Sequence, residues 1–207
     1  GVTKGGKMYL SSEAPTEAGR YVVNVTCLGN SFYGSSSATK WFNIDKADAA
    51  ISVDDDTVTY DGDPHGLTAT ATIADGAVDV SDQLVMHYNG NDEEPTDADS
   101  YEVVVTFPGN DNINPTAVKA ELVIEKAAVT VSLDGDSVVY NGAEHQLKGT
   151  AAFGETDLSD QLTYTYNGTD VLPVDAGSYE VKASFLGNKN LEPASAAATL
   201  AIAQRQV

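Results

Sequence analysis

A block of sequence returns along this chain at an interval of about 80 residues, and this repetition limits the possible folds more than any other feature. Residues 59–67 (TYDGDPHGL) return as residues 139–147 (VYNGAEHQL). A second block occurs three times, at residues 17–21, 97–101 and 175–179, and each copy is followed by Gly-Asn at the same distance. Chains with internal repeats of this kind fold as strings of similar small units.

The repeat divides the chain into three predicted segments. Residues 48–127 and 128–207 form two complete units, whereas residues 1–47 correspond only to the C-terminal half of a unit. Between the complete units, residues 124–131 (IEKAAVTV) contain neither Gly nor Pro, so the last strand of one unit is expected to pass directly into the first strand of the next. We therefore predict stiff connections, with each unit contacting mainly its neighbours.

Within each unit, apolar and polar residues alternate. In residues 179–185 the apolar side chains share one face and Glu, Lys and Ser share the other, which is typical of a half-buried β-strand. No segment shows helical periodicity, so we predict an all-β fold of tandem immunoglobulin-like β-sandwich repeats, with β-grasp-like units as the alternative. The inward faces are expected to be formed by Tyr179, Val181, Ala183 and Phe185, by Tyr101, Val103, Val105 and Phe107, and by Tyr21, Val23, Val25 and Cys27.

A tyrosine closes each copy of the thrice-repeated block, at Tyr21, Tyr101 and Tyr179. Immunoglobulin domains carry a tyrosine corner at the start of strand F, with a cysteine two residues later. Here the residue two positions later is valine in every copy, and the single cysteine, Cys27, cannot form an intramolecular disulfide. The three tyrosines are therefore predicted to be structural residues, and Cys27 to be a small buried apolar residue.

Several motifs together resemble a known family. They are Tyr-Asp/Asn-Gly-x-x-His-x-Leu, Tyr-Asn-Gly, Asp-Ala-Gly-Ser-Tyr-Glu-Val, Phe-x-Gly-Asn and Leu-x-Ile-x-Lys-Ala, the last at residues 122–127. This combination resembles the MBG/YDG-type repeats of large bacterial cell-surface proteins, over nearly all of residues 48–204 and the partial unit before them. The resemblance implies an extracellular location, on the bacterial surface or secreted, and it assigns no binding residue.

The chain carries 31 acidic against 11 basic residues, a formal net charge of −20. This charge repels phosphate backbones and anionic membrane surfaces, so neither nucleic acid nor membrane insertion is expected. No apolar run approaches the roughly 18 residues of a membrane span, and residues 1–10 lack the pattern of a signal peptide. The expected partners are neighbouring domains of the same polypeptide, with host or environmental glycans as a further class.

Acidic and amide side chains crowd several predicted loops. Calcium binds about six to eight oxygen ligands, which such loops can supply. None of them follows the calcium-loop pattern with its Gly and terminal Glu, and the clusters do not recur in the last unit. The expectation is no cofactor and no metal, with calcium as the alternative. Its candidate ligands are Asp54, Asp55, Asp56, Asp92 and Asp111.

The remaining reactive side chains form no catalytic pattern. His65 and His145 occupy equivalent positions, but the acidic residues near them do not recur, so we predict a structural role in the turn and a solvated His87. Lys46 and Lys126 are candidates for an intramolecular crosslink to asparagine, which their spacing does not support. No nucleophile elbow, metal pair or phosphate loop is present, so no catalytic residues are assigned and an enzyme is not expected.

These observations predict non-catalytic spacer repeats of a bacterial surface or secreted protein, as in the stalk of an adhesin. A module that binds carbohydrate or mucin glycans is the alternative, as are accessory repeats of an extracellular glycan-active enzyme. Glycan sites use exposed aromatic side chains, and the only tryptophan, Trp41, stands where the next unit has Glu121.

Overall fold

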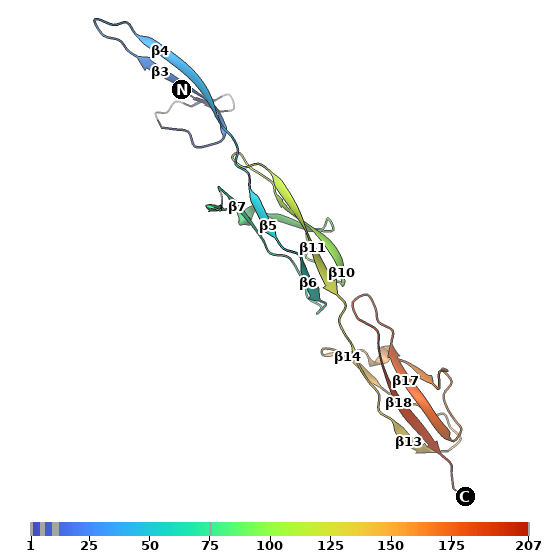
Figure 1. The fold of residues 1–207 in the computed structure, drawn as a ribbon. Helices are drawn as coiled ribbons and strands as arrows, with labels where there is room; N and C mark the ends of the chain where they lie inside the picture. The colour runs from blue at the N-terminus through green and yellow to red at the C-terminus, as the bar shows by residue number, and fades with distance from the viewer. Residues whose placement is uncertain (1, 5–6, 10–12, 75, 207) are drawn as a thin grey trace. The chain divides into compact units, whose positions relative to one another are not determined.

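The protein is built almost entirely of β-strands, as seen in a computed structural model that describes residues 2–4, 7–9, 13–74 and 76–206 (Figure 1). The helical segments of this part of the chain are two short 3-10 turns, η1 (Ser81–Gln83) and η2 (Ser159–Gln161). None of the described helical segments is long and apolar enough to cross a membrane. The fold is all-β, as the alternating pattern predicts, and the described residues lack the α-helix that a β-grasp unit requires.

The chain separates into two compact units, each described here by itself. The connection between the first and second repeats lies within unit 1, and the connection between the second and third repeats lies within unit 2. Unit 1 comprises Gly1–Asp55, Gly66–Glu93 and Tyr101–Glu121, and unit 2 comprises Asp56–His65, Glu94–Ser100 and Leu122–Val207.

The second repeat contains two sheets. The strands β5, β7 and β8 form a three-stranded sheet in that order, and the four-stranded sheet has the order β6-β11-β10-β9. Strand β6 pairs with the end of β11 in parallel, whereas β9 and β10 pair antiparallel. The strands are β5 (Ala50–Val53), β6 (Asp56–Thr59), β7 (Ala69–Ile73), β8 (Val78–Asp79), β9 (Val85–Tyr88), β10 (Asp99–Phe107) and β11 (Thr116–Glu125).

The third repeat has the same architecture. Its sheets have the orders β12-β14-β15 and β13-β18-β17-β16, again with one parallel pair, β13 on β18. Each complete repeat is thus an immunoglobulin-like β-sandwich. The strands are β12 (Thr130–Ser132), β13 (Asp136–Val139), β14 (Thr150–Phe153), β15 (Thr156–Asp157), β16 (Thr163–Tyr166), β17 (Gly177–Phe185) and β18 (Ala194–Ala203).

Alternate residues of the long strands form the cores, as predicted. In β10, Val103, Val105 and Phe107 are buried while the residues between them are at least partly exposed, because successive side chains of a strand point to opposite faces. In β17 the pattern repeats at Val181, Ala183 and Phe185. Phe185 packs in a cluster formed by Ala127, Val129, Ala151, Leu158, Leu162, Ala183 and Leu191.

The tyrosines at the start of these long strands make the hydrogen bond that defines a tyrosine corner. Tyr21 Oη donates to the carbonyl of Glu17 at 2.6 Å, and Tyr179 Oη donates to the carbonyl of Asp175 at 2.9 Å. Tyr101 occupies the corresponding position in β10 and is half-buried.

The described residues of the first repeat correspond to part of a repeat only. Its described residues form a two-stranded sheet of β3 (Gly19–Cys27) and β4 (Ser36–Ile44), and a separate pair, β1 (Val2–Lys4) and β2 (Lys7–Tyr9). The prediction that Cys27 is buried is wrong, because its side chain is exposed.

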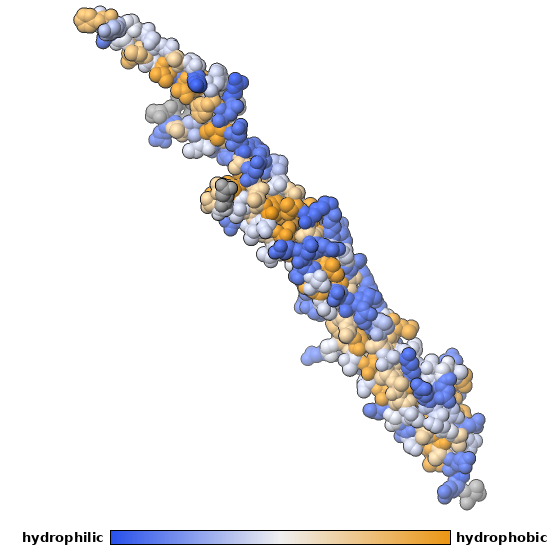
Figure 2. All heavy atoms as spheres, viewed as in Figure 1, coloured by the Kyte–Doolittle hydropathy of each residue, from blue (hydrophilic) through white to orange (hydrophobic). Residues whose placement is uncertain are grey.

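The same correction applies to Val23 and Val25, predicted to face inward, whose exposed fractions are 43% and 64%. Alternation places them on the face that carries the buried Tyr21, but at Val23 and Val25 this face is open to solvent. Figure 2 shows apolar residues at the tip of the β3–β4 hairpin. The exposed apolar and aromatic side chains of this tip are Leu28, Phe32 and Tyr33.

Candidate functional site

The loop between the two long strands of each repeat has the same internal hydrogen bonds in all three copies. In the second repeat, Asn110 Oδ1 accepts the backbone N–H groups of Asn112 and Ile113, both at 2.9 Å. An asparagine that bonds its own backbone in this way fixes the loop locally, before any contact with a neighbour. The equivalent acceptors are Asn30, for Phe32 and Tyr33, and Asn188, for Asn190 and Leu191.

The glycine that precedes each of these asparagines is required by the loop backbone. Gly187 has φ +78°, and a Cβ placed on it would lie 2.9 Å from the carbonyl oxygen of Leu191. Gly29 and Gly109 have φ +72° and +78° and leave equally little space. Since a side chain would meet backbone atoms, only glycine preserves this loop.

In unit 1 this loop holds the chain that connects the first repeat to the second. Lys46 Nζ donates to the carbonyl of Asn110 at 2.7 Å, and Ala47 N–H donates to the carbonyl of Asn112 at 2.9 Å. The N–H of Asn114 donates back to the carbonyl of Ala47 at 2.8 Å, so Ala47 forms a parallel bridge with Ile113. The connecting segment is therefore a bound part of the sheet edge.

In unit 2 the same contacts recur at the second connection. Lys126 Nζ donates to the carbonyl of Asn188 at 2.6 Å, and Ala127 N–H donates to the carbonyl of Asn190 at 3.0 Å. Glu192 N–H donates to the carbonyl of Ala127 at 2.8 Å, which completes the parallel bridge of Ala127 with Leu191. We call each of these two sets of contacts a junction clamp.

The turn before the tyrosine at each connection also forms a hydrogen bond with the loop. Ala98 N–H donates to Asn190 Oδ1 at 2.8 Å, and Ala18 N–H donates to Asn112 Oδ1 at 2.9 Å. In each clamp, the side chain of an asparagine thus accepts a backbone N–H of the thrice-repeated block.

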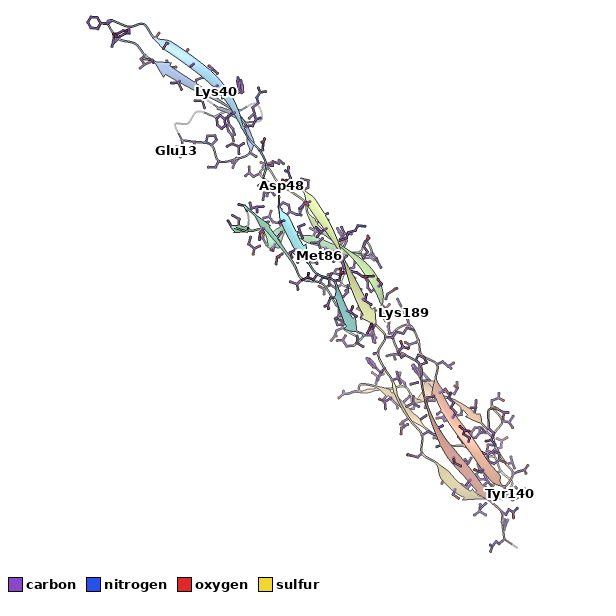
Figure 3. All side chains as sticks on the ribbon, viewed as in Figure 1. Glu13, Lys40, Asp48, Met86, Tyr140 and Lys189 are labelled. Carbon is purple, nitrogen blue, oxygen red and sulfur yellow. The ribbon has the colours of Figure 1, made fainter. Side chains whose placement is uncertain are left out.

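Unit 2 contains further contacts at its clamp. Asn190 Nδ2 donates to Asp97 Oδ1 at 2.9 Å, and Lys189, labelled in Figure 3, forms an ion pair with Asp97 at 2.7 Å. The ring of Tyr60 also lies 5.7 Å from the ring of Phe153, centroid to centroid. These contacts add a charged pair and an aromatic pair to the backbone bonds.

The C-terminal end of the third repeat has residues equivalent to those of the second clamp, with two substitutions. Tyr140, equivalent to Tyr60, lies beside the end of β18 (Figure 3), and its N–H donates to the carbonyl of Ala203 at 2.8 Å. It lines a cavity of about 600 Å³ with Ala176 and Gln204. Gln204 stands where the clamps have lysine, and Arg205 stands where they have alanine.

The ion pair in unit 2 makes this clamp sensitive to acid. The Lys189 ammonium, followed by the Asn190 amide, lowers the pKa of Asp97 below its ordinary value of 3.8. Because the folded pKa is the lower one, this contribution to stability is present above pH 3.8 and is lost as the pH falls through the folded value. We expect the Asp97 bonds to persist at pH 3.8 and to open only below it, as the pH falls through the lowered pKa of Asp97, which an NMR titration of the Asp97 carboxyl carbon would measure.

The same titration in Lys189→Ala is expected to move the Asp97 midpoint upward. Lys182→Ala removes an exposed lysine that does not contact Asp97 and should leave the midpoint unchanged. An unchanged midpoint in Lys189→Ala would show that the ion pair does not form in solution.

The calcium candidates are not brought together. Asp55 Oδ1 accepts the N–H of Glu121 at 2.7 Å, and Asp56 Oδ1 accepts the N–H of Thr57 at 2.8 Å. Asp54 and Asp111 are exposed. Among the described residues, no three His, Cys, Asp or Glu side chains are grouped closely enough to hold a metal ion. Asp92, the fifth candidate, contacts His87 Nδ1 at 2.7 Å.

The three histidines have different surroundings. His65 Nε2 lies 3.0 Å from Asp61 Oδ1, and the N–H of Asp63 and then this ring lower the pKa of Asp61. His145 Nε2 is buried and has no hydrogen-bond partner within the described parts of the chain. His87, predicted to be solvated, has a side chain that is 39% exposed. The contacts of His65 and His87 are with acidic residues four and five positions away in the sequence.

Trp41, considered above as a sugar platform, is half-exposed on β4. The guanidinium of Arg20 lies over its ring, 4.6 Å from the centroid, so a cation–π contact covers one face of the indole.

Sequence reasoning did not find the junction clamps, although their signals were present. Lys46 and Lys126 precede an alanine at the same place in consecutive repeats, and Asn112 and Asn190 recur two residues after the Gly-Asn pair. From the sequence these lysines are candidates for crosslinks and not for hydrogen bonds at the connections, because nothing local indicates which distant carbonyl a lysine will reach.

Comparison with solved structures finds other chains of tandem β-domains at low identity. Fibronectin(III)-like modules of Clostridium thermocellum CbhA are 8% identical with a TM-score of 0.32, covering 75% of this chain and 95% of that chain. The titin domains z1z2, in complex with telethonin, are 15% identical with a TM-score of 0.40, covering 78% and 98%. Drosophila N-cadherin EC1-4 is 11% identical with a TM-score of 0.33, covering 92% and 59%.

No curated protein sequence matches the chain at a significant level. The family model described as MBG domain matches it in three consecutive segments, residues 3–48, 49–128 and 129–206.

Proposed function

The chain belongs to the MBG domain family, and from that premise we propose that it is a spacer: tandem, non-catalytic repeats of a bacterial cell-surface or secreted protein, forming the stalk of an adhesin. The observation that carries this proposal is the junction clamp, which occurs at both connections with the same donors and acceptors. A spacer has to keep successive repeats from bending freely, and bonds to the connecting segment do this.

The contacts in the clamps suit a mechanical role better than a chemical one. Four of the six bonds of the two junction clamps join backbone groups to each other, so these groups are already paired. The titratable contacts are single pairs, such as Lys189 with Asp97, without the third group that a nucleophile and its base require. The exposed acidic surface keeps such a chain soluble outside the cell.

Replacing Asn190 by alanine is expected to loosen the second connection. The variant loses the bonds to Ala98 N–H and to Asp97, and a hydrogen bond of this kind contributes about 0.5–1.5 kcal/mol. The coupling between the second and third repeats should therefore fall by about 1–3 kcal/mol. Backbone amide NMR relaxation of the full chain would measure it, as a difference in tumbling between the two repeats that the unchanged protein lacks.

A suitable control is Asn141→Ala, which removes one turn bond, to Ala143 N–H, that is not part of a clamp. It should leave the tumbling of the repeats coupled. Independent tumbling of the repeats in the unchanged protein, or small-angle scattering typical of a freely bending chain, would count against the spacer proposal.

A further inference from the structure

The turn after strand β6 contains a histidine that is paired with a carboxylate. His65 Nε2 lies 3.0 Å from Asp61 Oδ1, and the same oxygen accepts the N–H of Asp63 at 2.9 Å. One carboxylate therefore holds both the turn backbone and the imidazole ring. An imidazole nitrogen that is removed from water requires a polar partner, and Asp61 provides it here.

The equivalent turn after β13 lacks this contact. The Nε2 atom of His145 is buried, and no described residue forms a hydrogen bond with it. Asn141 stands where the second repeat has Asp61. Its Oδ1 accepts the N–H of Ala143 at 2.8 Å, so its side chain has the position in the turn that Asp61 has in the second repeat. The third repeat thus has the histidine of this pair but an amide in place of the carboxylate.

Asn141 is followed by glycine, and asparagine loses ammonia most readily in this dipeptide. A main-chain nitrogen can attack the side-chain carbonyl of the asparagine before it, and glycine leaves this nitrogen unshielded because it has no Cβ. Asn141 and Gly142 are both exposed, and a Cβ built on Gly142 would have no atom within 4 Å apart from its chain neighbours. The bond from Ala143 N–H folds the Asn141 side chain over Gly142, which brings Cγ toward the Gly142 nitrogen.

The two other Asn-Gly pairs of the chain lie in turns that hold the asparagine. Asn89 and Asn167 have left-handed backbones, with φ +48° and +47°. Asn89 N–H donates to the carbonyl of Glu102 at 2.9 Å, and Asn89 Oδ1 accepts the N–H of Glu102 at 2.9 Å. Asn167 forms the same two bonds with Glu180, both at 2.8 Å. Both side chains are thereby bound to the adjacent strand and are not free to turn toward the nitrogen of the following glycine.

We propose that Asn141 is a site of spontaneous deamidation, and that the aspartate formed there supplies the missing partner of His145. The Gly142 nitrogen attacks Cγ of Asn141 and forms an N–Cγ bond, while the amide group leaves as ammonia with the proton of Gly142 N–H. Water then adds to Cγ of this succinimide and breaks the new N–Cγ bond, which restores the main chain and leaves a carboxyl group in place of the amide. The reaction requires only water. The inference does not depend on the spacer role of the clamps.

A carboxylate at position 141 suits His145 better than the amide does. An ionised carboxylate offers only acceptors, at about four lone-pair sites, whereas half of the amide group is a donor. One oxygen can therefore accept the Ala143 N–H and the imidazole N–H together, as Asp61 does in the second repeat. A hydrogen bond to an ionised acceptor is also the stronger kind. Deamidation would thus give the third turn the contacts of the second.

The site is tested by prolonged incubation of the full chain in a mildly alkaline buffer, followed by mass spectrometry of its proteolytic peptides. Deamidation is expected first at Asn141, before Asn89 and Asn167. In urea the three asparagines should react at similar rates, because all of them precede glycine. Gly142→Ala should slow the reaction at Asn141 about tenfold, because the new Cβ shields the attacking nitrogen.

Two results of the incubation would overturn the proposal. One is reaction of Asn89 or Asn167 as fast as Asn141 in the folded chain. The other is a preference for Asn141 that persists in urea, since the turn would then not be its cause.

The product is tested in Asn141→Asp by NMR of the histidine ring nitrogens. The His145 Nε2 resonance should move toward that of His65 Nε2, and the same change should grow in the incubated chain with the deamidated fraction. Gln161→Glu is the control, because it adds the same charge at an exposed position outside this turn and should leave the His145 resonance unchanged.

An unchanged His145 Nε2 resonance in Asn141→Asp would show that the aspartate is not its partner. Isoaspartate as the only product at position 141 would equally overturn the proposal, because water would then have opened the succinimide at the main-chain carbonyl. None of these outcomes bears on the clamps, whose test is the tumbling of the second and third repeats.

Discussion

Replacing Phe185 by alanine is expected to lower the free energy of unfolding of the third repeat by about 3–5 kcal/mol. Phe185 is 2% exposed and packs in the cluster that also contains Ala127 and Leu191, the two residues of the parallel bridge in the second clamp. The loss combines the transfer energy of the ring with the cavity left behind, which the surrounding strands can fill only in part. Amide hydrogen exchange of β17 and β18 would measure the change for this repeat alone.

The neighbouring residue provides the control for that experiment. Leu186 is 76% exposed, so Leu186→Ala should change the stability by no more than about 0.5 kcal/mol. Equal effects of the two substitutions would mean that the side chain of Phe185 is not enclosed, and that the third repeat lacks the sandwich core described above.

Replacing Gly187 by alanine is expected to cost about 3 kcal/mol, from backbone strain at positive φ and from a contact that forces the loop to move. At φ +78° the new Cβ would lie 2.9 Å from the carbonyl oxygen of Leu191 and from the nitrogen of Pro193. The loop carries the carbonyls that bind Lys126 and Ala127, so the second clamp should open as well. Urea unfolding would report the stability, and amide NMR relaxation would report the coupling.

Gly142→Ala separates the two causes of this loss. Gly142 has φ +79°, but a Cβ on it would have no atom within 4 Å. This variant should therefore show only the cost of the left-handed conformation, about 1–2 kcal/mol, with the clamp intact. If both variants lose the same stability and coupling, the close approach to Leu191 and Pro193 is not what makes Gly187 necessary.

Much of the fold of the complete repeats could be predicted from local patterns. The alternation that places Val181, Ala183 and Phe185 on one face is a property of the strand itself, and the structure buries all three. The predicted tyrosine corner has the expected hydrogen bond at Tyr21 and at Tyr179. These features depend on residues close in sequence, which is why pattern and spacing were sufficient.

For the junction clamps, the sequence shows the residues that recur but not which residues they contact. Gly-Asn pairs and the lysine-alanine pair recur visibly, but their partners lie some 60 residues away, as Lys46 and Asn110 do. The prediction for Cys27 failed for a related reason. Alternation tells which face a side chain takes, whereas burial requires other residues packed over that face, and the Cys27 end of β3 is exposed.

The sequence by itself determined the repeat length, the all-β class and the face that each strand residue takes, because these follow from the two-residue period of a strand and from turn residues fixed in place. Only the tertiary structure decided which carbonyls bind Lys46 and Lys126, and which edges and faces are covered. Such contacts depend on how distant segments meet, and the same alternating strand is buried at Val103 and exposed at Val23 according to what packs against it.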